Sequence, residues 1–255
     1  MAGRRSAPPS VAIGVEVVGF IALPLAIWLL PFRLDATAAA FAFAGGVVGG
    51  LGLIAFYRAM AMNLIGVVAP VTAVIAASLP VAVGVVVGGE RLHAGQLAGI
   101  FVGLAAIALI NGGGGMATSG ARAAVGLAIL AGIGFGLFFI LYHGASAAGV
   151  MAFVSGRVGS ALGALTFALV SRVAFVPHRS VWRLLALGGS FDGIGVVLYL
   201  YATFHGLLSL SALLTSFYPA FTVLCARIFI HERLAPIQAV GAALAIAAIA
   251  LIAAT

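Results

Sequence analysis

The sequence predicts an all-α polytopic membrane protein built from two inverted repeats of about five transmembrane helices, with nine helices visible in the chain. Three observations support this class: an apolar composition, a series of long apolar runs, and a segment that occurs twice. The chain of 255 residues is 64% hydrophobic and only 7% charged. A water-soluble domain of this length needs more polar surface, so we expect lipid to surround the chain.

The charged residues fit the same class. All 12 basic residues are arginines, and the net charge is +7. Most of them lie between apolar runs, where arginine contacts lipid headgroups and helps to set membrane orientation. We therefore expect the lipid bilayer, and no nucleic acid, to be the partner of this basic charge. The only cysteine, Cys225, leaves no partner for an intrachain disulfide.

A transmembrane helix needs about 20 apolar residues, and nine segments meet or nearly meet this length. They are too long, and alternate too little, for the strands of a membrane barrel. Helices also satisfy their own backbone hydrogen bonds in lipid. The predicted spans are residues 11–30, 36–56, 64–88, 95–111, 123–141, 149–171, 181–204, 207–230 and 236–253.

One segment of the chain occurs twice, 142 residues apart. Residues 90–110 and 232–252 are identical at 11 of 21 positions, and both begin with Glu-Arg-Leu. Shared polar residues at fixed spacing are unexpected in a chain with so few charges, and they indicate an internal duplication. Five predicted spans separate the two Glu-Arg-Leu motifs, so the copies cross the membrane in opposite directions, as in inverted-repeat transporters.

The duplication also predicts the division of the chain. We expect a first repeat at residues 1–111, a glycine-rich linker at 112–122 and a second repeat at 123–255. The second repeat accounts for five spans and the first for only four. The first helix of the first repeat is therefore expected to be missing.

Several motifs resemble those of a known family. They are the Glu-Arg-Leu turns, Phe-Tyr-Arg-Ala-Met-Ala at 56–61, Ser-Phe-Asp at 190–192 and Leu-Tyr-Leu-Tyr-Ala at 198–202. Together they resemble the EamA-type carriers of the drug/metabolite transporter superfamily, over essentially the whole chain. The resemblance implies ten helices in two inverted five-helix repeats, and alternating-access transport of a small metabolite. The chain begins in what resembles the second of these helices.

Three charged residues inside predicted spans are candidates for substrate binding or ion coupling, because an ionisable group in a membrane helix is costly. Glu16, six residues into the first span, could exchange protons in a coupled carrier. Arg157, its approximate counterpart in the second half, could bind an anionic group or pair with Glu16. Asp192 lies about twelve residues into its span. The alternative for each is a place near the interface, with access to water or headgroups.

Aromatic and hydroxyl side chains near helix ends are further candidates for the substrate site. Tyr57 and Tyr199 are 142 residues apart and are therefore repeat mates. The remaining candidates are Tyr201, His205, Ser216 and Tyr218. The alternative roles are interfacial anchoring for the aromatic residues and hydrogen bonding between helices for serine.

The repeated motif, comprising Glu90, Arg91, Glu232 and Arg233, is expected to be structural. Each acid lies within five residues of the next predicted span. There it can satisfy the free N–H groups and the dipole of a helix N-terminus. We expect no catalytic residue, metal site or cofactor, because the sequence lacks the motifs of catalytic triads, metal ligands and phosphate loops.

These observations predict a multi-pass secondary transporter of the cytoplasmic membrane that moves a small molecule by alternating access. Its driving force would be protons, through Glu16 or Asp192, or the substrate gradient alone. A non-transporting or truncated membrane subunit is the main alternative. A membrane-embedded enzyme is less favoured, because no cluster of polar catalytic residues gathers at one membrane face. Association into a homodimer remains open.

Overall fold

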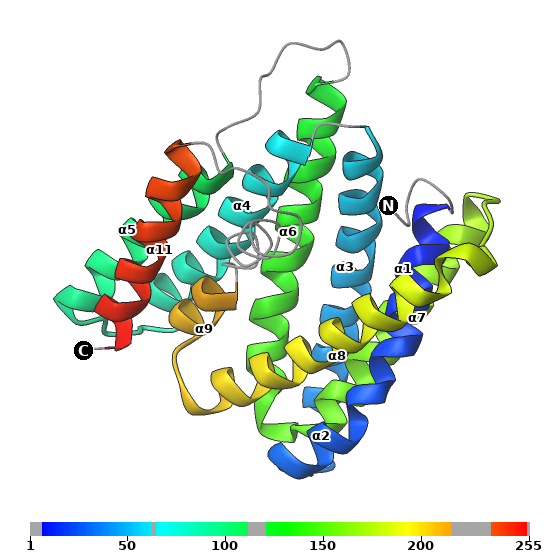
Figure 1. Cartoon of the computed structure of the whole chain (residues 1–255). Helices are drawn as coiled ribbons and strands as arrows, with labels where there is room; N and C mark the ends of the chain where they lie inside the picture. Colours follow the sequence, from blue (N-terminus) through cyan, green and yellow to red (C-terminus); the bar gives the residue numbers. More distant parts are fainter. Residues whose placement is uncertain (1–6, 63–64, 112–120, 216–235, 254–255) are drawn as a thin grey trace.

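The computed structural model describes residues 7–62, 65–111, 121–215 and 236–253, and these residues are almost entirely helical (Figure 1). This part of the chain contains no β-strand, only an isolated bridge between Phe32 and Gly149. The helices are α1 (Pro8–Gly19), α2 (Leu23–Leu29), α3 (Ala36–Ala61), α4 (Ile65–Val86), α5 (Ala94–Asn111), α6 (Ala121–Ala145), α7 (Val150–Val170), α8 (Trp182–His205), α9 (Leu208–Thr215) and α11 (Pro236–Ala253).

Eight of the nine predicted spans are helical over most of their length. The other, 207–230, is described only over α9, because residues 216–235 lie outside the described part of the chain; residues 112–120 of the predicted linker do so too. α3 continues past the predicted end at residue 56 to Ala61. The extension follows because alanine, methionine and arginine favour helix even where the apolar run is interrupted.

Five helical segments of the described chain are long and apolar enough to cross a membrane. Two shorter apolar stretches lie in α4 and α5. The five segments are Pro8–Leu29, Ala36–Ala61, Arg122–Ala148, Val150–Val170 and Arg179–His205.

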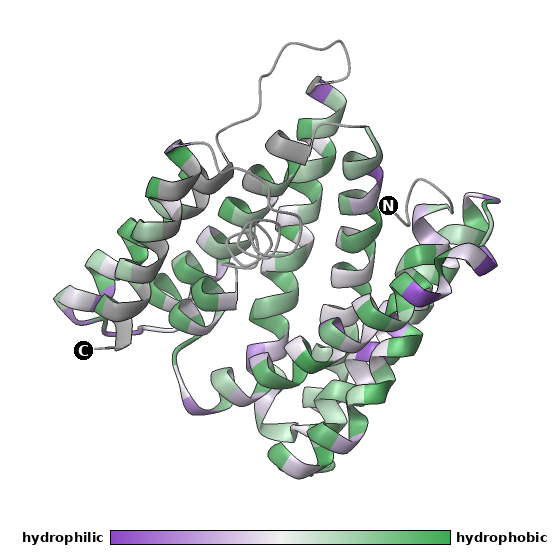
Figure 2. Cartoon of the chain, in the orientation of Figure 1, coloured by the Kyte–Doolittle hydropathy of each residue, from purple (hydrophilic) through white to green (hydrophobic). Residues whose placement is uncertain are grey.

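The outer surface of these helices is apolar. Large side chains such as Ile21, Leu130 and Phe191 are 65%, 60% and 73% exposed. Figure 2 shows hydrophobic segments along most of each helix, with hydrophilic ones mainly at helix ends. Such a surface is stable against lipid and not against water, so the chain is a multi-pass membrane protein.

The first predicted span is one run in the sequence but is interrupted in the structure. α1 ends at Gly19, a short 3₁₀ turn follows, and α2 begins at Leu23. Pro24 lies in the first turn of α2, where its missing N–H group costs no hydrogen bond. In a continuous helix its ring would clash with the carbonyl group of Phe20.

α3 begins with a capped N-terminus. Asp35 has an extended backbone, and its Oδ1 atom accepts hydrogen bonds from Thr37 N at 2.9 Å and Ala38 N at 3.0 Å. These bonds satisfy N–H groups that have no partner within the helix. The start of this central helix is therefore set by its own sequence.

Glycines allow α3 to pack closely against α6 and α7. A Cβ atom added to Gly46 would overlap the carbonyl oxygen of Gly156 on α7, and one added to Gly49 would lie 2.9 Å from Phe138 on α6. Membrane helices associate through such close contacts because lipid supplies no hydrophobic force between them. The glycines therefore determine how closely α3 approaches α6 and α7.

Gly149 allows the chain to turn between α6 and α7. Its φ angle is +54°, and a Cβ atom there would overlap the carbonyl oxygen of Pro31. That carbonyl accepts a hydrogen bond from Val150 N at 2.9 Å. Only glycine combines this backbone conformation with such a close approach, so the turn fixes α7 beside the end of α2.

The helices form two packed groups that meet at α4, α6 and α9. α5 lies along α11 and against α4 and α9, at one side of the molecule (Figure 1). α1, α7 and α8 pack together on the other side, with α3 and α6 between. This arrangement brings α1, α3, α6, α7, α8 and α9 around one interior space.

The Gly46 contact predicts a matched pair of variants. Gly46→Ala should lower the free energy of unfolding by about 1–3 kcal/mol, because the added methyl group forces α3 and α7 apart. Gly126→Ala, in α6, has nothing within 4 Å of the added carbon and should be neutral or slightly stabilising. Thermal unfolding of the purified proteins in detergent measures both. Equal midpoints for the two variants would contradict the packing argument.

Candidate functional site

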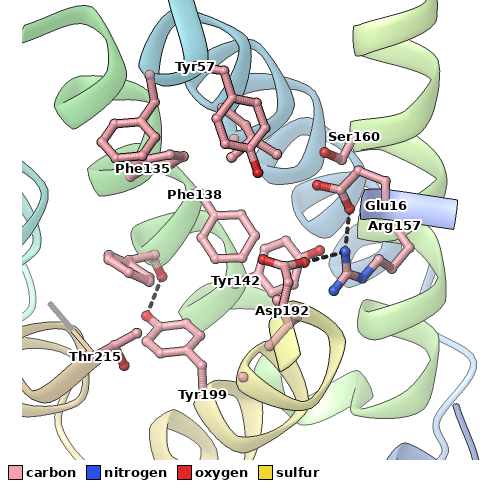
Figure 3. Close-up of a pocket in the computed structure, with 16 residues that line it drawn as sticks. Glu16, Tyr57, Phe135, Phe138, Tyr142, Arg157, Ser160, Asp192, Tyr199 and Thr215 are labelled. Carbon is pink, nitrogen blue, oxygen red and sulfur yellow. Dashed lines mark hydrogen bonds and ion pairs between the residues drawn. The ribbon is translucent and has the colours of Figure 1, made fainter. Parts of the chain in front are cut away.

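A cavity of about 330 Å³ lies among the helices and is lined by three charged residues of the predicted spans (Figure 3). α1, α3, α6, α7, α8 and α9 each contribute at least one residue to its lining. Its size is at the lower end of the range for small-molecule sites. The cavity is therefore the candidate binding site.

The guanidinium group of Arg157 connects two carboxylates in this cavity. Its Nη1 atom donates a hydrogen bond to Glu16 Oε2 at 2.5 Å and forms an ion pair with Asp192 Oδ2 at 2.7 Å. The three side chains come from α7, α1 and α8. The sequence left two possibilities for Arg157, binding an anionic group or pairing with Glu16; the pair with Glu16 is present, and Asp192 joins it.

The three members of this network differ in exposure. The side chains of Arg157, Glu16 and Asp192 are 2%, 10% and 39% exposed. The Nε and Nη2 atoms of Arg157 have no hydrogen-bond partner among the described residues. Asp192 is therefore the most exposed of the three side chains, although its Oδ2 atom is buried, and the guanidinium group is almost fully buried.

The sequence makes room for the guanidinium group with a glycine. A Cβ atom on Gly19 would lie 2.6 Å from Arg157 Cζ and within 2.8 Å of both Nη atoms. On the other side, Arg157 Cζ lies 5.6 Å from the centre of the Phe153 ring, within cation–π range. Position 19 therefore has to remain glycine for this arrangement.

Charges at this depth are costly to keep. Removing an ion from water costs several kcal/mol, and a buried ion pair offsets this cost only when its geometry is good. When both carboxylates are ionised, one positive group shared by two negative groups leaves an excess of one negative charge. Such a network gives little stability, so its presence in a membrane interior favours a functional role.

Aromatic side chains form the other walls of the cavity. Four phenylalanines and three tyrosines line it. Phe138 lies 4.1 Å from Tyr142 between ring centres, and Phe139 lies 4.8 Å from Tyr199. The Tyr199 hydroxyl group donates to the backbone oxygen of Phe139 at 2.7 Å, which fixes α8 against α6 (Figure 3).

Glu90 makes a structural contact with α9, and not with α5, which follows it in the sequence. Its Oε1 atom accepts hydrogen bonds from Leu208 N at 2.6 Å and Ser209 N at 3.4 Å, at the start of α9. The turn before α5 therefore caps a helix from the other half of the chain. Arg91 is exposed, and Glu232 and Arg233 lie outside the described residues.

The structure brings together some of the candidate residues and not others. Glu16, Tyr57, Arg157, Asp192 and Tyr199 line the cavity. Tyr201 and His205 are not among its lining residues. They lie together near the end of α8, with ring centres 4.7 Å apart. Ser216 and Tyr218 lie outside the described residues.

Sequence reasoning missed the contribution of α6. Phe135, Phe138, Phe139 and Tyr142 all face the cavity. Their spacing of three and four residues places them on one side of a helix, which was the available signal. In a segment that is apolar on every side, this signal does not distinguish a cavity wall from a lipid-facing surface.

The lining of the cavity is suited to binding a small molecule. Two carboxylates, one guanidinium group and several aromatic rings can hold it, and the carboxylates can exchange protons. No group of three metal-ligating side chains occurs in the part of the chain that the structure describes.

Apolar helices around a charged internal cavity are typical of membrane transporters. A model of the EamA-like transporter family matches residues 122–254. The chain therefore belongs to the EamA-like transporter family, and it is a transporter-like membrane protein at the level of that family.

Similar structures support the fold. One solved structure, described only as "Crystal structure of protein", superposes with a TM-score of 0.74 at 17% sequence identity. The match covers 99% of this chain and 91% of that chain. At this identity it shows the fold alone. No curated protein matches the chain.

The ion network predicts strong coupling between its members. Arg157→Gln should lower the free energy of unfolding by about 3 kcal/mol, because it leaves two carboxylates without their cation. Glu16→Gln should cost less, because Asp192 still pairs with the guanidinium group. The free energy of unfolding of the double variant should fall by clearly less than the sum of the two single decreases. Unfolding by titration with a denaturing detergent measures this cycle. Strictly additive losses would show that the two groups do not interact.

Proposed function

We propose that the protein is a secondary transporter that binds a small metabolite in the cavity and moves it by alternating access. The observation that carries the proposal is the network of Glu16, Arg157 and Asp192 at the wall of the cavity. Charged groups at membrane depth mark substrate and ion pathways. Membership of a transporter family supports the same conclusion.

The proposal treats residues 1–111 and 123–255 as inverted repeats joined by the linker at 112–122. Its support is a pair of corresponding helix contacts, one between α3 and α7 and the other between α8 and α1. In each contact, two residues four positions apart on one helix pack against two residues four positions apart on the other helix. The contacts are Gly46 on Gly156 and Gly50 on Ser160, and Gly189 on Val15 and Gly193 on Gly19.

Other packing fits this symmetry. α5 and α11, which carry the duplicated segments, lie side by side (Figure 1). On α8, Gly188 and Gly195 have nothing within 4 Å. Among the described helices, none packs against this side of α8 in the way that α6 packs against α3. This open place agrees with the first repeat of only four helices that the sequence predicts.

In this proposal the seam between the halves is the moving part. Glu16 belongs to the first half, whereas Arg157 and Asp192 belong to the second, so the ion network crosses the seam. Rocking of one half against the other would separate these groups and open the cavity to one side of the membrane. A bound substrate or proton that changes the network would bias that equilibrium.

Two driving forces fit the site. A proton taken up by Glu16 or Asp192 would remove the excess negative charge, and one taken up by Glu16 would also weaken the bond across the seam; either would couple transport to protons. The substrate gradient alone would need no such step. We place the protein in the cytoplasmic membrane as a monomer or homodimer.

The substrate itself can be found by comparing cells with and without the gene. Untargeted metabolite profiling of the two should reveal a compound whose internal and external amounts change in opposite directions. Uptake of that compound into vesicles containing the purified protein would then establish transport. Absence of any protein-dependent flux of compounds found in this way would contradict the proposed function.

The coupling prediction concerns Glu16. With the compound so identified, Glu16→Gln should abolish the stimulation of uptake by an imposed pH gradient while keeping exchange of labelled for unlabelled substrate. Asp35→Asn is the matched control, because Asp35 caps α3 outside the cavity and asparagine caps equally well. Stimulation of Glu16→Gln equal to that of the control would remove Glu16 from the coupling step.

A further inference from the structure

We infer that the cavity selects organic cations, such as an amine or quaternary ammonium group attached to an apolar body. This inference rests on the proposed function, because it names the class of molecule that the transporter would bind. It is carried by the charge balance of the cavity, by the exposure of its charged groups and by its aromatic walls.

The charge balance favours a positive ligand. The charged residues among the lining are two carboxylates and a guanidinium group. The guanidinium nitrogen that contacts Glu16 also contacts Asp192, so one positive charge is shared between two negative charges. A monovalent cation would bring the described site to neutrality, and charges in a low-dielectric interior interact strongly.

The exposure of these groups agrees with the charge balance. Asp192 keeps 39% of its side chain exposed, whereas Glu16 keeps 10% and Arg157 only 2%. In Figure 3 the Asp192 carboxylate lies between the guanidinium group of Arg157 and Phe138. A ligand in the cavity therefore meets a carboxylate before it meets the buried guanidinium group.

The aromatic walls supply the second half of the recognition. Phe135, Phe138 and Tyr142 from α6, together with Phe56 and Tyr57 from α3, line the cavity. The faces of aromatic rings attract cations, and quaternary ammonium groups are commonly bound by several rings acting together. The same rings also accept the apolar body of such a molecule.

Other ligand classes fit less well. An anion would have to approach an exposed carboxylate to reach the guanidinium group, whose Nη1 atom contacts both carboxylates and whose Nε and Nη2 atoms, unpartnered among the described residues, are buried. A polyhydroxylated neutral molecule needs several free hydrogen-bond partners. Two of the lining hydroxyl groups, those of Tyr199 and Thr215, donate instead to the backbone oxygens of Phe139 and Ser211.

The test compares two probes of similar size and opposite charge, phenyltrimethylammonium and benzenesulfonate. Binding to the full-length protein, purified in a mild nonionic detergent, is measured by titration calorimetry. We expect phenyltrimethylammonium to bind at least about tenfold more tightly than benzenesulfonate. Equal binding, tighter binding of benzenesulfonate, or no binding of the cation would overturn the inference.

Two variants locate the cation within the cavity. Asp192→Asn should weaken phenyltrimethylammonium binding about tenfold, because it removes the exposed charge. Phe138→Leu should weaken it about threefold, because it keeps an apolar side chain but loses the ring. Asp35→Asn, the matched loss of a carboxylate outside the cavity, should leave the dissociation constant unchanged. Unfolding midpoints identify folded variants, and Glu16→Gln replaces Asp192→Asn if the latter does not fold.

The outcomes separate substrate class from transport. Cation binding that depends on Asp192, without flux in vesicles, would retain the ligand class and contradict the transport function. Protein-dependent flux of an anionic or uncharged metabolite, with no binding of the cation, would retain the transport function and overturn the ligand class.

Discussion

The bridge that Arg157 forms between Glu16 and Asp192 is the constraint on which the arrangement of the site depends. One nitrogen atom contacts carboxylates from two other helices, at 2.5 Å and 2.7 Å. These distances require α1, α7 and α8 to approach closely at the same depth. Because a charge left alone in this interior is strongly destabilising, the three helices must be placed together.

The close approach is possible because glycines lie at the crossing points. Gly19 leaves space for the guanidinium group, and Gly193 on α8 packs against the backbone of Gly19. Gly46 and Gly50 do the same for α3 and α7. The polar network and the glycine contacts therefore support each other: the glycines bring the helices close, and the ion pairs select one relative depth for them.

The cavity results from the same packing. Glycines lie at the contacts of α3 with α7, whereas the rings of Phe138 and Tyr142 line the cavity together with Asp192. Aromatic rings and a carboxylate around one space make it largely apolar, with a negative group in its wall. A binding site of this kind distinguishes ligands by charge, while the rings tolerate variation in the shape of the apolar part.

The sequence by itself determined the class of the protein, the positions of most helices and the presence of charges within them. These properties depend on residue counts along the chain, because about 20 apolar residues span a bilayer whatever their partners are. The candidates Glu16, Arg157, Asp192, Tyr57 and Tyr199 could be found in this way, since charged or aromatic groups stand out in an apolar run.

Only the tertiary structure decided which of these residues meet. It joined Asp192 to the pair of Glu16 and Arg157, directed Glu90 to the start of α9, and made the rings of α6 a wall of the cavity. The physical reason is that these helices are apolar on every side. Hydropathy then predicts that a segment crosses the membrane but not how it is rotated, and rotation and depth depend on contacts between helices distant in the sequence.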